Sequence, residues 1–445
     1  MRLRRIIMKD KLVVTGTGDS LFVADIPEEY FNGDFKEIKA YIDGCDIKMT
    51  NLETNVSKFG SFPNSFSGGT WLNTEPEVFD DLTKFGFNYY GTANNHCMDY
   101  GYHGMLSTID ELDKRGLAHS GTGKSLEEAS APALLNVAGK KTAILAVNCE
   151  YSAVHTGARA GVKTNLMQGR PGVNYFRHDD YVNISKEEYE KLKELEEGFG
   201  INVERNREIA DGFILADPEG VYTFGSIKFC YDGSKKTTEC NKADKERIIN
   251  SIKEAKKEND YVFILIHCHD SKPEFNASVP DYYEELARAC IDAGASAIIG
   301  GGTHELRAIE IYNGCPILYS LGDFIYQGMR VAHLPADFME KFGLDKNATA
   351  YEGLMKRSKN NTIGLQVHKC NFMTVLPKIT YENGKMTSLE LMPVVAGFKK
   401  PGKLDGLPYH AINEESQEIY DILNKLSTPY GTKIIKNGDM LKVEL

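Results

Sequence analysis

The sequence predicts an α/β fold, and two observations carry this prediction. Six apolar segments each end in polar or ionisable residues, and helical patterns lie between several of them. Continuous apolar runs of about four to six residues are typical of strands buried on both faces, as in a covered parallel sheet. Strands that alternate with helices indicate parallel pairing through right-handed crossovers.

The predicted elements follow in order along the chain. The strand segments cover residues 11–19, 46–53, 87–96, 142–150, 261–270 and 296–305. Apolar residues spaced three and four apart predict helices over 76–84, 104–115, 242–258 and 281–293, the last ending at Gly294. Ligands of such sheets bind outside the carboxyl ends of the strands. We therefore expect the functional site where these segments end.

Two regions break this alternation. Residues 155–240 form an insertion rich in charge and glycine, with a helix predicted near 186–197 and a strand at 220–228. We expect one domain over 11–330 that contains this insertion, and a β-rich C-terminal extension over 331–445 that packs on it. The extension carries predicted strands at 362–367, 371–381 and 386–395, with a turn at Glu382-Asn383-Gly384. A helix near 415–426 and a hairpin around Asn437-Gly438 follow.

Composition excludes several classes of function. The 445 residues are 42% hydrophobic and 26% charged, as in ordinary globular proteins. The 63 acidic and 52 basic residues give a formal charge of −11, which argues against nucleic-acid and anionic-membrane binding. No segment approaches the ~18 apolar residues of a membrane span, and no signal-like apolar stretch follows the basic N-terminus. The nine cysteines form no CxxC pair, which favours reduced thiols in a cytoplasmic protein.

The residues at the segment ends share one chemistry. They are Asp19, Glu53, Asn94, Asn95, His96, His267, His269, His304 and Asp323. Carboxylate, carboxamide and imidazole groups together are what divalent Mn, Fe or Zn prefers. Two metals ~3.5–4 Å apart also need a bridging carboxylate and a polar group over the substrate oxygen. Each residue alone has a structural explanation, such as a turn or cap, but their common placement predicts a site for one or two divalent ions.

These residues belong to a longer series of motifs. In order, the motifs are Gly18-Asp19, Asn51-Leu52-Glu53, Ala93-Asn94-Asn95-His96 with Asp99-Tyr100-Gly101, His267, Gly300 with His304, and Tyr319-Ser320-Leu321-Gly322-Asp323-Phe324. The series resembles the CapA family of poly-γ-glutamate capsule synthesis proteins, within the calcineurin-like metallophosphoesterase superfamily. The resemblance covers nearly the whole chain and implies a calcineurin-like sandwich.

The resemblance also implies roles by position. It implies five metal ligands: Asp19 and His304 on the first metal, Glu53 as the bridge, and Asn95 and His267 on the second. His96 would protonate the leaving group or hold the oxyanion. The family usually has His-Pro-His where this chain has Gly302-Thr303-His304, so one imidazole is missing. Either His269 or Asp270 compensates, or the site holds one metal.

Substrate contacts are expected from two places. Asn94 and Asp323 are candidates at the cluster itself. A basic run, His155, Arg159, Lys163, Arg170, Arg177 and His178, lies in the insertion. Such a run is usually a solvated loop, but Arg159 and Arg170 are candidate clamps for carboxylate or phosphate. Segment 61–71, with Gly68-Gly69, is either a rim of the same pocket or a plain surface loop.

These patterns favour a metal-dependent hydrolase that acts on a phosphoester or a γ-glutamyl-type amide of a small or polymeric anionic substrate. The alternative is a poly-γ-glutamate capsule biosynthesis or export component that binds polymer without hydrolysing it. A third possibility is a binding module without catalysis, which the missing histidine allows. A stoichiometric divalent ion would distinguish the enzyme from the binding module.

Overall fold

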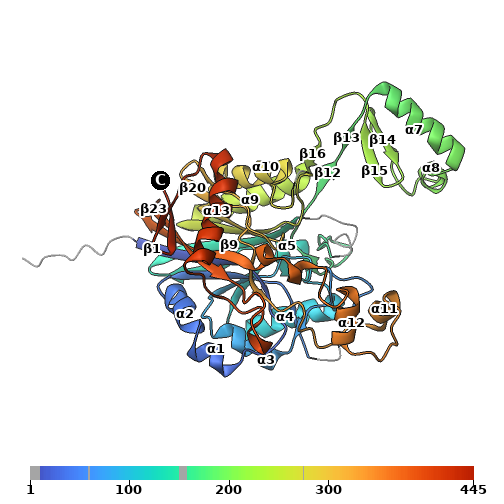
Figure 1. Cartoon of the computed structure of the whole chain (residues 1–445). Helices are drawn as coiled ribbons and strands as arrows, with labels where there is room; N and C mark the ends of the chain where they lie inside the picture. The colour runs from blue at the N-terminus through green and yellow to red at the C-terminus, as the bar shows by residue number, and fades with distance from the viewer. Residues whose placement is uncertain (1–10, 59–60, 150–157, 274) are drawn as a thin grey trace, which may run out of the picture.

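Two β-sheets stack face to face, and helices cover their outer faces (Figure 1). The computed structural model describes residues 11–58, 61–149, 158–273 and 275–445. Val14 and Met49 of one sheet and Ile144 and Leu265 of the other belong to one buried apolar cluster between the sheets. Burial of this apolar surface from water is the main force that holds the two sheets together.

The first sheet has ten strands. One side of it consists of four parallel strands, β1 (Lys11–Leu21), β2 (Ile47–Leu52), β5 (Tyr89–Gly91) and the edge strand β6 (Ala118–Ser120). Beyond β1 it continues through the antiparallel strands β22 (Met373–Glu382), β23 (Lys385–Val395), β26 (Met440–Val443) and β25 (Ile434–Asn437). Strand β21 (Asp323–Tyr326) pairs in parallel with the end of β1, and β24 (Tyr409–His410) pairs with β23.

The second sheet has seven strands. Its parallel core is β9 (Lys140–Cys149), β17 (Tyr261–His267), β18 (Ala297–Gly301) and β20 (Cys315–Leu318). Strands β8 (Ala133–Val137) and β19 (Ile309–Tyr312) are antiparallel to their neighbours, and β11 (Tyr175–Phe176) is parallel to β9. The register pairs His267 with Asn148 and with Gly301. The carboxyl ends of these strands therefore lie level with one another.

Helices cover each sheet on its outer face (Figure 1). Helices α2 (Phe35–Asp43), α3 (Pro76–Thr83) and α4 (Gly101–Lys114) pack on the first sheet, and α9 (Lys242–Glu258) and α10 (Asp281–Asp292) pack on the second. Local sequence explains several of these helices. Pro76 occupies the first turn of α3, and the Asn241 side chain caps the start of α9. Among the described residues, no helix combines the length and apolar character that crossing a membrane requires.

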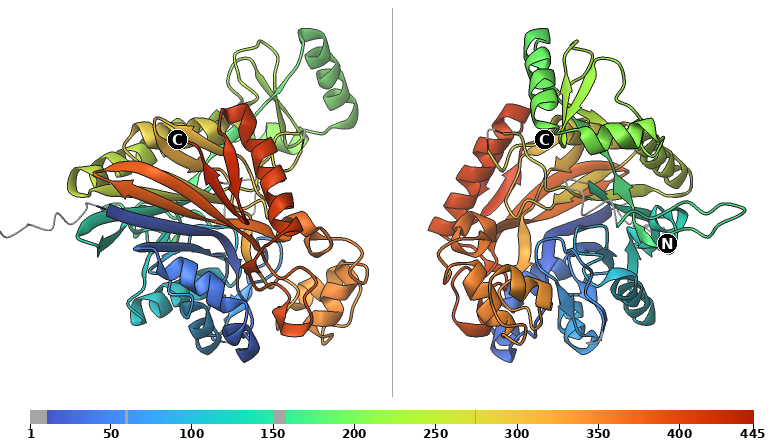
Figure 2. Two further views of the ribbon diagram at one scale, coloured as in Figure 1. Left: turned by 60° about the vertical axis from the view of Figure 1, so that its left-hand side comes forward. Right: turned by 90° about the vertical axis from the view of Figure 1, so that its right-hand side faces the viewer.

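The insertion forms an arm that projects from the stacked sheets (Figures 1 and 2). Strands β12 (His178–Asp180) and β16 (Thr238–Cys240) pair at its base. Its outer part contains α7 (Lys186–Phe199), α8 (Val203–Ala210) and the small sheet of β13 (Val182–Asn183), β14 (Val221–Phe224) and β15 (Ile227–Cys230). The helix predicted near 186–197 is confirmed as α7. Ser185 and Glu188 form a capping box that stabilises its start.

The elements not yet named are short or lie in the extension. They are α1 (Glu28–Asn32), β3 (Asn55–Val56), β4 (Asn73–Thr74), β7 (Thr122–Gly123), α5 (Leu126–Ala129), β10 (Gly172–Val173), α11 (Ala336–Lys341), α12 (Ala350–Arg357) and α13 (Glu414–Ser427). Four short 3₁₀ helices, η1 (Leu365–Val367), η2 (Lys369–Phe372), η3 (Gly402–Leu404) and η4 (Thr428–Tyr430), complete the description. Figure 2 shows α11 and α12 beside the end of the stacked sheets.

Most predicted elements are confirmed, and three predictions are wrong. Every one of the six strand segments contains a strand, the four helices are present, and the terminal helix and hairpin form as expected. However, the apolar runs alone predicted one covered parallel sheet, and the buried strands form two stacked sheets. Leu265 faces the other sheet and Ile264 faces the helices, so a strand between two layers has the same apolar pattern in either arrangement.

The other two errors come from backbone conformation. The predicted strand 220–228 is a hairpin of β14 and β15, because Gly225 turns the chain with φ +63°. The predicted strand 362–367 contains the 3₁₀ helix η1. Asn360 and Asn361 before it have φ near +57° and +59°, and Gly364 has φ +107°, which no extended strand tolerates.

A close backbone approach fixes the end of β1. A Cβ atom on Gly18 would lie 1.7 Å from the carbonyl oxygen of Gly322, which also accepts the Asp19 N–H at 3.0 Å.

We expect Gly18→Ala to lower the free energy of unfolding by about 1–3 kcal/mol or more, because the strands must separate. Gly198→Ala, on exposed α7 with no atom near its Cβ position, is the matched control. Urea unfolding midpoints measure both; a Gly18→Ala midpoint equal to that of the control would contradict this view.

Candidate metal centre

The strand ends of both sheets meet in one cluster of carboxylate, amide and imidazole groups. Asp19 lies in β1, Glu53 follows β2, and Asn95 and His96 follow β5 in the first sheet. The second sheet contributes His267 at the end of β17, with His269 and His304 from the loops after β17 and β18. All of these side chains are buried or nearly so. The expected gathering at the carboxyl ends of the strands is therefore observed, across two sheets.

Glu53 lies at the centre of the cluster without a hydrogen-bond partner. Its side chain is fully buried, and neither carboxylate oxygen has a partner among the described residues. The nearest imidazoles are His267, with Nε2 at 3.6 Å from Oε1, and His96, with Nε2 at 3.9 Å. Burial, and then repulsion by Asp19, Asp323 and Asp99, raise the pKa of Glu53 well above its usual value. Such a carboxylate is suited to a cation that the protein itself does not supply.

Two groups of ligand atoms share Glu53. Asp19, Glu53 and His267 form one group, and Glu53, His269 and His304 form the other. Within each group the ligand atoms lie within 4.8 Å of one another. Oxygen and imidazole nitrogen donors suit Mn, Fe or Zn, and the unpartnered Glu53 carboxylate is the group that would be shared by two ions. The residues present therefore fit one or two divalent ions.

Asp19 and His267 are held together by amide groups. Asn51 Nδ2 donates to Asp19 Oδ1 at 2.7 Å, and the Gly302 N–H donates to Asp19 Oδ2 at 2.5 Å. His267 Nδ1 lies 3.4 Å from Asp19, and its Nε2 lies 2.7 Å from Asn95 Oδ1. Burial opposes ionisation of Asp19, but His267 and Asn51 outweigh it and lower the pKa of Asp19. The lowered pKa favours the anionic form of Asp19.

His269 lies in the cluster, beside His267. Strand β17 ends at His267, yet His269 Nε2 still lies 3.1 Å from His267 Nε2. A strand that ended early was expected to turn His269 away, but the loop turns it back into the cluster. Asp270 points elsewhere, because it accepts a hydrogen bond from Tyr282 OH at 2.5 Å and lies 3.5 Å from His178. Of the two candidates for compensation, only His269 joins the cluster.

Gly302 itself has no room for a side chain. Its φ is +114°, and a Cβ atom would lie 2.7 Å from the backbone N, C and O atoms of Cys268. The Cys268 N–H also donates to the Gly301 carbonyl at 2.9 Å. This close approach between the two loops brings His269 toward His304, whose rings are 5.4 Å apart. The absence of a side chain at Gly302 thus permits the close approach that places His269 near His304.

Asp323 holds His304 in place. His304 has φ +59°, and its Nδ1 lies 2.9 Å from Asp323 Oδ2. Burial disfavours the charged imidazole, but Asp323 and Asp19 raise the pKa of His304 above its usual value. Burial raises the pKa of Asp323 to about 6, although His304 opposes this. The structure therefore gives Asp323, expected at the substrate, a direct partner in His304.

His96 forms a pair with Asp99. Its Nδ1 lies 2.6 Å from Asp99 Oδ2, which leaves Nε2 facing Glu53. Asp99 also accepts the N–H groups of Gly68 at 2.9 Å and Leu72 at 2.8 Å. Burial raises the pKa of Asp99, with His96 acting against it. The imidazole orientation is thus fixed from behind by a carboxylate.

Asn94 supports this pair from within the fold. It is fully buried, donates to Asn51 Oδ1 at 3.1 Å and to the Leu52 carbonyl at 2.9 Å, and accepts the His96 N–H at 3.1 Å. Asn94 therefore ties β2 to the loop that carries His96, although it was expected to contact substrate.

A pocket of about 480 Å³ opens over the three imidazoles His96, His269 and His304. Gly68, Gly69 and Thr70 line one side, so segment 61–71 is a rim of this pocket, one of the two alternatives for it. Asn95 Nδ2 donates to the Gly68 carbonyl at 3.0 Å, and a Cβ on Gly68 would lie 2.7 Å from that nitrogen. The C-terminal extension supplies the other side, from Arg357 to Gln366.

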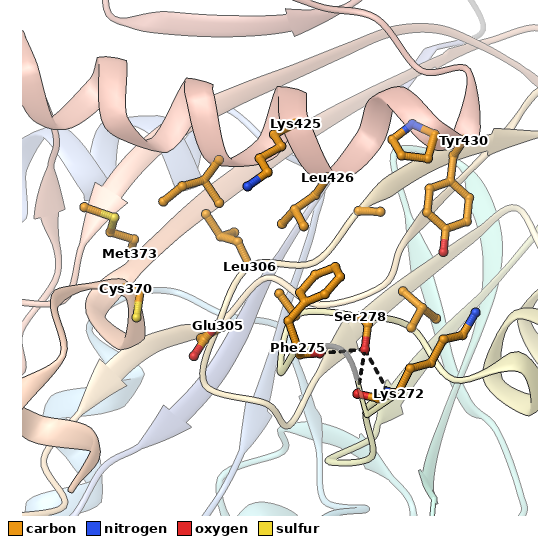
Figure 3. Close-up of a pocket in the computed structure, with 15 residues that line it drawn as sticks. Lys272, Phe275, Ser278, Glu305, Leu306, Cys370, Met373, Lys425, Leu426 and Tyr430 are labelled. Carbon is orange, nitrogen blue, oxygen red and sulfur yellow. Dashed lines mark hydrogen bonds between the residues drawn. The ribbon is translucent and has the colours of Figure 1, made fainter. Parts of the chain in front are cut away.

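A second cavity of about 580 Å³ lies on the far side of the loop after β18 (Figure 3). Its lining is mainly apolar, with Leu306, Met373 and Leu426 among the labelled side chains, and Lys425 reaches in from α13. Glu305 lines this cavity, whereas the preceding His304 lines the pocket over the cluster. The second cavity contains no residue of the cluster.

A comparison with protein families identifies the group to which the chain belongs. The family described as "Bacterial capsule synthesis protein PGA_cap" matches residues 13–328. The chain is a member of this CapA family. The match spans the strand ends of both sheets, from Asp19 to Asp323, so the whole cluster lies within the region typical of the family.

Several relatives extend this family assignment. Uncharacterized protein y4sH of Sinorhizobium fredii is 29% identical over 96% of this chain and 91% of its own length. The PGA biosynthesis protein CapA of Bacillus subtilis is 28% identical over 71% of this chain and 62% of its own. A probable polyglutamine synthesis accessory protein of Mycobacterium tuberculosis is 24% identical over 64% and 57%. GAP50, the anchor in the inner membrane complex of Plasmodium, covers 94% of this chain with a TM-score of only 0.31 and 8% identity, which supports no argument about fold.

Within this CapA-family member, the two groups of candidate ligand atoms place Asp19 with His267 and His304 with His269. Asn51 bridges Asp19 to His267, and Asp323 holds His304. The assignment of Asp19 and His304 to one metal stays a prediction. Asn95, the other expected ligand, hydrogen-bonds His267.

The two candidate arginine clamps lie outside the pocket over the imidazoles. The Arg159 guanidinium stacks 5.6 Å over the Tyr175 ring, and Arg170 Nε donates to the Arg159 carbonyl at 2.9 Å. Neither is among the residues that line the pocket. His155 of the same run, like Glu150, lies outside the described residues.

Three residues beside the cluster were not among the expected ligands or substrate contacts. Asp99 orients His96, and Asn51 bridges Asp19 and His267 from β2; both stand in the motif series without an expected role. Asn148 pairs with His267 in the sheet register, is 1% exposed, and has no partner for either amide atom among the described residues. Its place near the polar end of segment 142–150 was the available signal.

The unpartnered state of Glu53 predicts an unusual mutational result. We expect Glu53→Gln, in chelator-treated protein, to keep a free energy of unfolding within about 1 kcal/mol of wild type or above it, because it removes a repelled charge. Glu310→Gln is the matched control, since Glu310 accepts hydrogen bonds from Tyr319 OH at 2.6 Å and Arg288 Nε at 3.0 Å. That control should lose about 1.5–3 kcal/mol. Thermal unfolding measures the stability of both variants. A loss of stability in Glu53→Gln larger than that in Glu310→Gln would contradict the view that Glu53 has no hydrogen-bond partner.

Proposed function

We propose that this CapA-family protein is a metal-dependent hydrolase of a phosphoester or a γ-glutamyl-type amide in an anionic substrate. One observation carries the proposal: the buried, unpartnered Glu53 carboxylate is shared by two groups of metal-ligand type. Buried carboxylates with strongly shifted pKa values cluster at functional sites because catalysis and ligand binding need groups whose pKa is set by burial and neighbouring charges. The pocket over the imidazoles supplies space for a substrate.

The proposed roles follow from the geometry. Asp19, Glu53, His267, His269 and His304 would hold the divalent ion or ions, of Mn, Fe or Zn type. When bound, such ions lower the pKa of water and polarise the oxygen of the scissile group. Asn95, within 2.7 Å of His267, would keep that imidazole oriented or serve as a further ligand.

His96 is the proposed proton carrier. Asp99 binds Nδ1, so proton exchange with the reacting group takes place at Nε2, which faces the cluster. The carboxylate stabilises the imidazolium when Nε2 is protonated, and it fixes the ring so that the proton is delivered to one position. Donation from Nε2 to a leaving oxygen or nitrogen completes the cleavage.

A second function is favoured by the names of the relatives. Those names describe biosynthesis and accessory proteins and state no hydrolysis. The alternative is therefore a component of poly-γ-glutamate synthesis or export that binds polymer without cleaving it. The cytoplasmic location and the division of the chain near residue 330 stay predictions.

The deciding experiment combines metal analysis with hydrolysis assays. Purified protein is freed of metal, reloaded with Mn²⁺, Zn²⁺ or Fe²⁺, and assayed on phosphate esters and on γ-glutamyl oligomers. The hydrolase proposal expects turnover that depends on a bound ion and disappears in Glu53→Ala. Bound polymer without turnover under any metal would favour the accessory role, and absence of a bound ion would contradict the metal centre.

His269→Ala tests whether this residue completes a second metal position. We expect the metal content to fall by about one ion per chain and turnover to be nearly abolished, because a two-metal mechanism needs both ions. His119→Ala is the matched control, since His119 pairs with Asp113 away from the cluster. Elemental analysis measures both variants. An unchanged metal content in His269→Ala would indicate that this imidazole is not a ligand.

His96→Ala separates proton transfer from metal binding. We expect kcat to fall by about 10²–10⁴-fold while the metal content stays near that of wild type. Steady-state kinetics and elemental analysis on the same preparation give the two quantities. A parallel loss of metal and activity would assign His96 as a ligand.

A further inference from the structure

Arg357 stands out among the residues of the pocket over the imidazoles. It is the last residue of α12 and lines this pocket with His96, His269 and His304. Its positive charge acts against the burial that raises the pKa of Tyr326. The ring of Tyr326 lies 6.3 Å from that of His304. Arg357 therefore lies on the wall of the pocket, across Tyr326 from the cluster.

The contacts of Arg357 leave its charge without a counterion. Nη1 donates to Thr70 Oγ1 on the opposite rim, and the guanidinium lies 5.8 Å over the Phe338 ring. No carboxylate forms an ion pair with it among the described residues. A guanidinium has five N–H donors, so most of its donors remain available.

Two other partly buried arginines of this protein have carboxylate partners. Arg115 pairs with Asp80 and Glu111, and Arg177 pairs with Asp244. Burial lowers the pKa of Arg357, with only Tyr326 acting in the opposite direction. Keeping a partly buried cation without an anion costs free energy. This cost is explained if an anion enters from outside.

The pocket contains few other charges. Besides the three imidazoles, its lining consists of apolar side chains, glycines and the neutral polar residues Thr70, Tyr326, Ser358 and Gln366. Arg357 is the one lining side chain with a permanent charge. An anion in this pocket, away from the metal ligands, therefore has a single strong partner.

We propose that Arg357 binds a carboxylate of the substrate, separate from the group that is cleaved at the Glu53 cluster. The inference rests on the proposed function for the identity of the substrate, a γ-linked glutamyl chain. In such a chain each unit carries an α-carboxylate beside the γ-amide, so one unit places both groups near each other. Arg357 would thus determine specificity and position the substrate.

Charge favours a carboxylate over a phosphate at Arg357. A guanidinium carries one positive charge and matches one carboxylate through two parallel hydrogen bonds. A phosphate monoester carries about −1.5 to −2 charges near pH 7. The single permanent charge of the pocket lining would leave part of that charge uncompensated.

The test compares a ligand that has α-carboxylates with an analogue that has carboxamides in their place. Tri-γ-glutamate and its α-carboxamide analogue are titrated by calorimetry into chelator-treated full-length protein, and phenyl phosphate is a third probe. Wild type should prefer tri-γ-glutamate. Arg357→Gln should weaken tri-γ-glutamate binding by about 10–100-fold and remove the preference over the amide. Arg357→Lys keeps the positive charge but cannot form the two parallel hydrogen bonds of a guanidinium. Its affinity for tri-γ-glutamate should lie between those of wild type and Arg357→Gln.

Lys356→Gln is the matched control. It removes a positive charge from the neighbouring, exposed position of α12, outside the pocket lining. It should change the affinity by no more than about twofold. If Arg357→Gln lowers the melting temperature, the comparison is made with Arg357→Lys. Metal content, measured before the chelator treatment, should be unchanged in every variant, which shows that the cluster is intact.

The outcomes separate this proposal from the hydrolase proposal. Loss of the carboxylate preference in Arg357→Gln supports it, whether or not any metal gives turnover. If turnover occurs, KM should rise with little change in kcat. An equal preference in wild type and Arg357→Gln, an equal loss in Lys356→Gln, or no binding of tri-γ-glutamate by wild type would overturn it. An Arg357-dependent preference for phenyl phosphate would overturn the assignment of a carboxylate.

Discussion

A carboxylate that is fully buried, has no hydrogen-bond donor and lies near three other carboxylates is costly to keep in a folded protein. Glu53 is such a group, with Asp19, Asp99 and Asp323 around it. The fold holds it there by joining the ends of two sheets and by close backbone contacts at Gly18 and Gly302. Cations bound between Glu53 and the imidazoles would relieve this repulsion, so the cost in stability is the physical basis of the proposed metal centre.

Three of the four imidazoles of the cluster have a supporting partner behind them. Asp99 supports His96, Asp323 supports His304, and Asn95 with Asn51 supports His267. Such outer contacts fix ring orientation and tautomer, and they make ligand positions rigid. Asn94 and Asp323, the expected substrate contacts, form hydrogen bonds within the protein. Residues of the rim and of the C-terminal extension line the pocket over the imidazoles.

The cluster could be predicted from the sequence because strands end where their apolar runs end. Asp19, Glu53 and His267 needed only that rule and the parallel pairing of strands. The apolar runs alone could not predict how the strands divide between two sheets. Leu265 and Ile264 point to opposite faces of β17, and both are apolar. The return of His269 depended on the close contact of Gly302 with Cys268, which is a tertiary feature. Arg357 was missed because the strand predicted at 362–367 hid the turn that brings this segment over the imidazoles.

The most direct test of the account is anomalous diffraction from crystals grown with Mn²⁺. It predicts two anomalous peaks that flank the Glu53 carboxylate, one beside Asp19 and His267 and the other beside His269 and His304. A single peak in contact with Glu53 would restrict the account to one metal. Peaks remote from Glu53, or no peak at saturating Mn²⁺, would contradict its central claim.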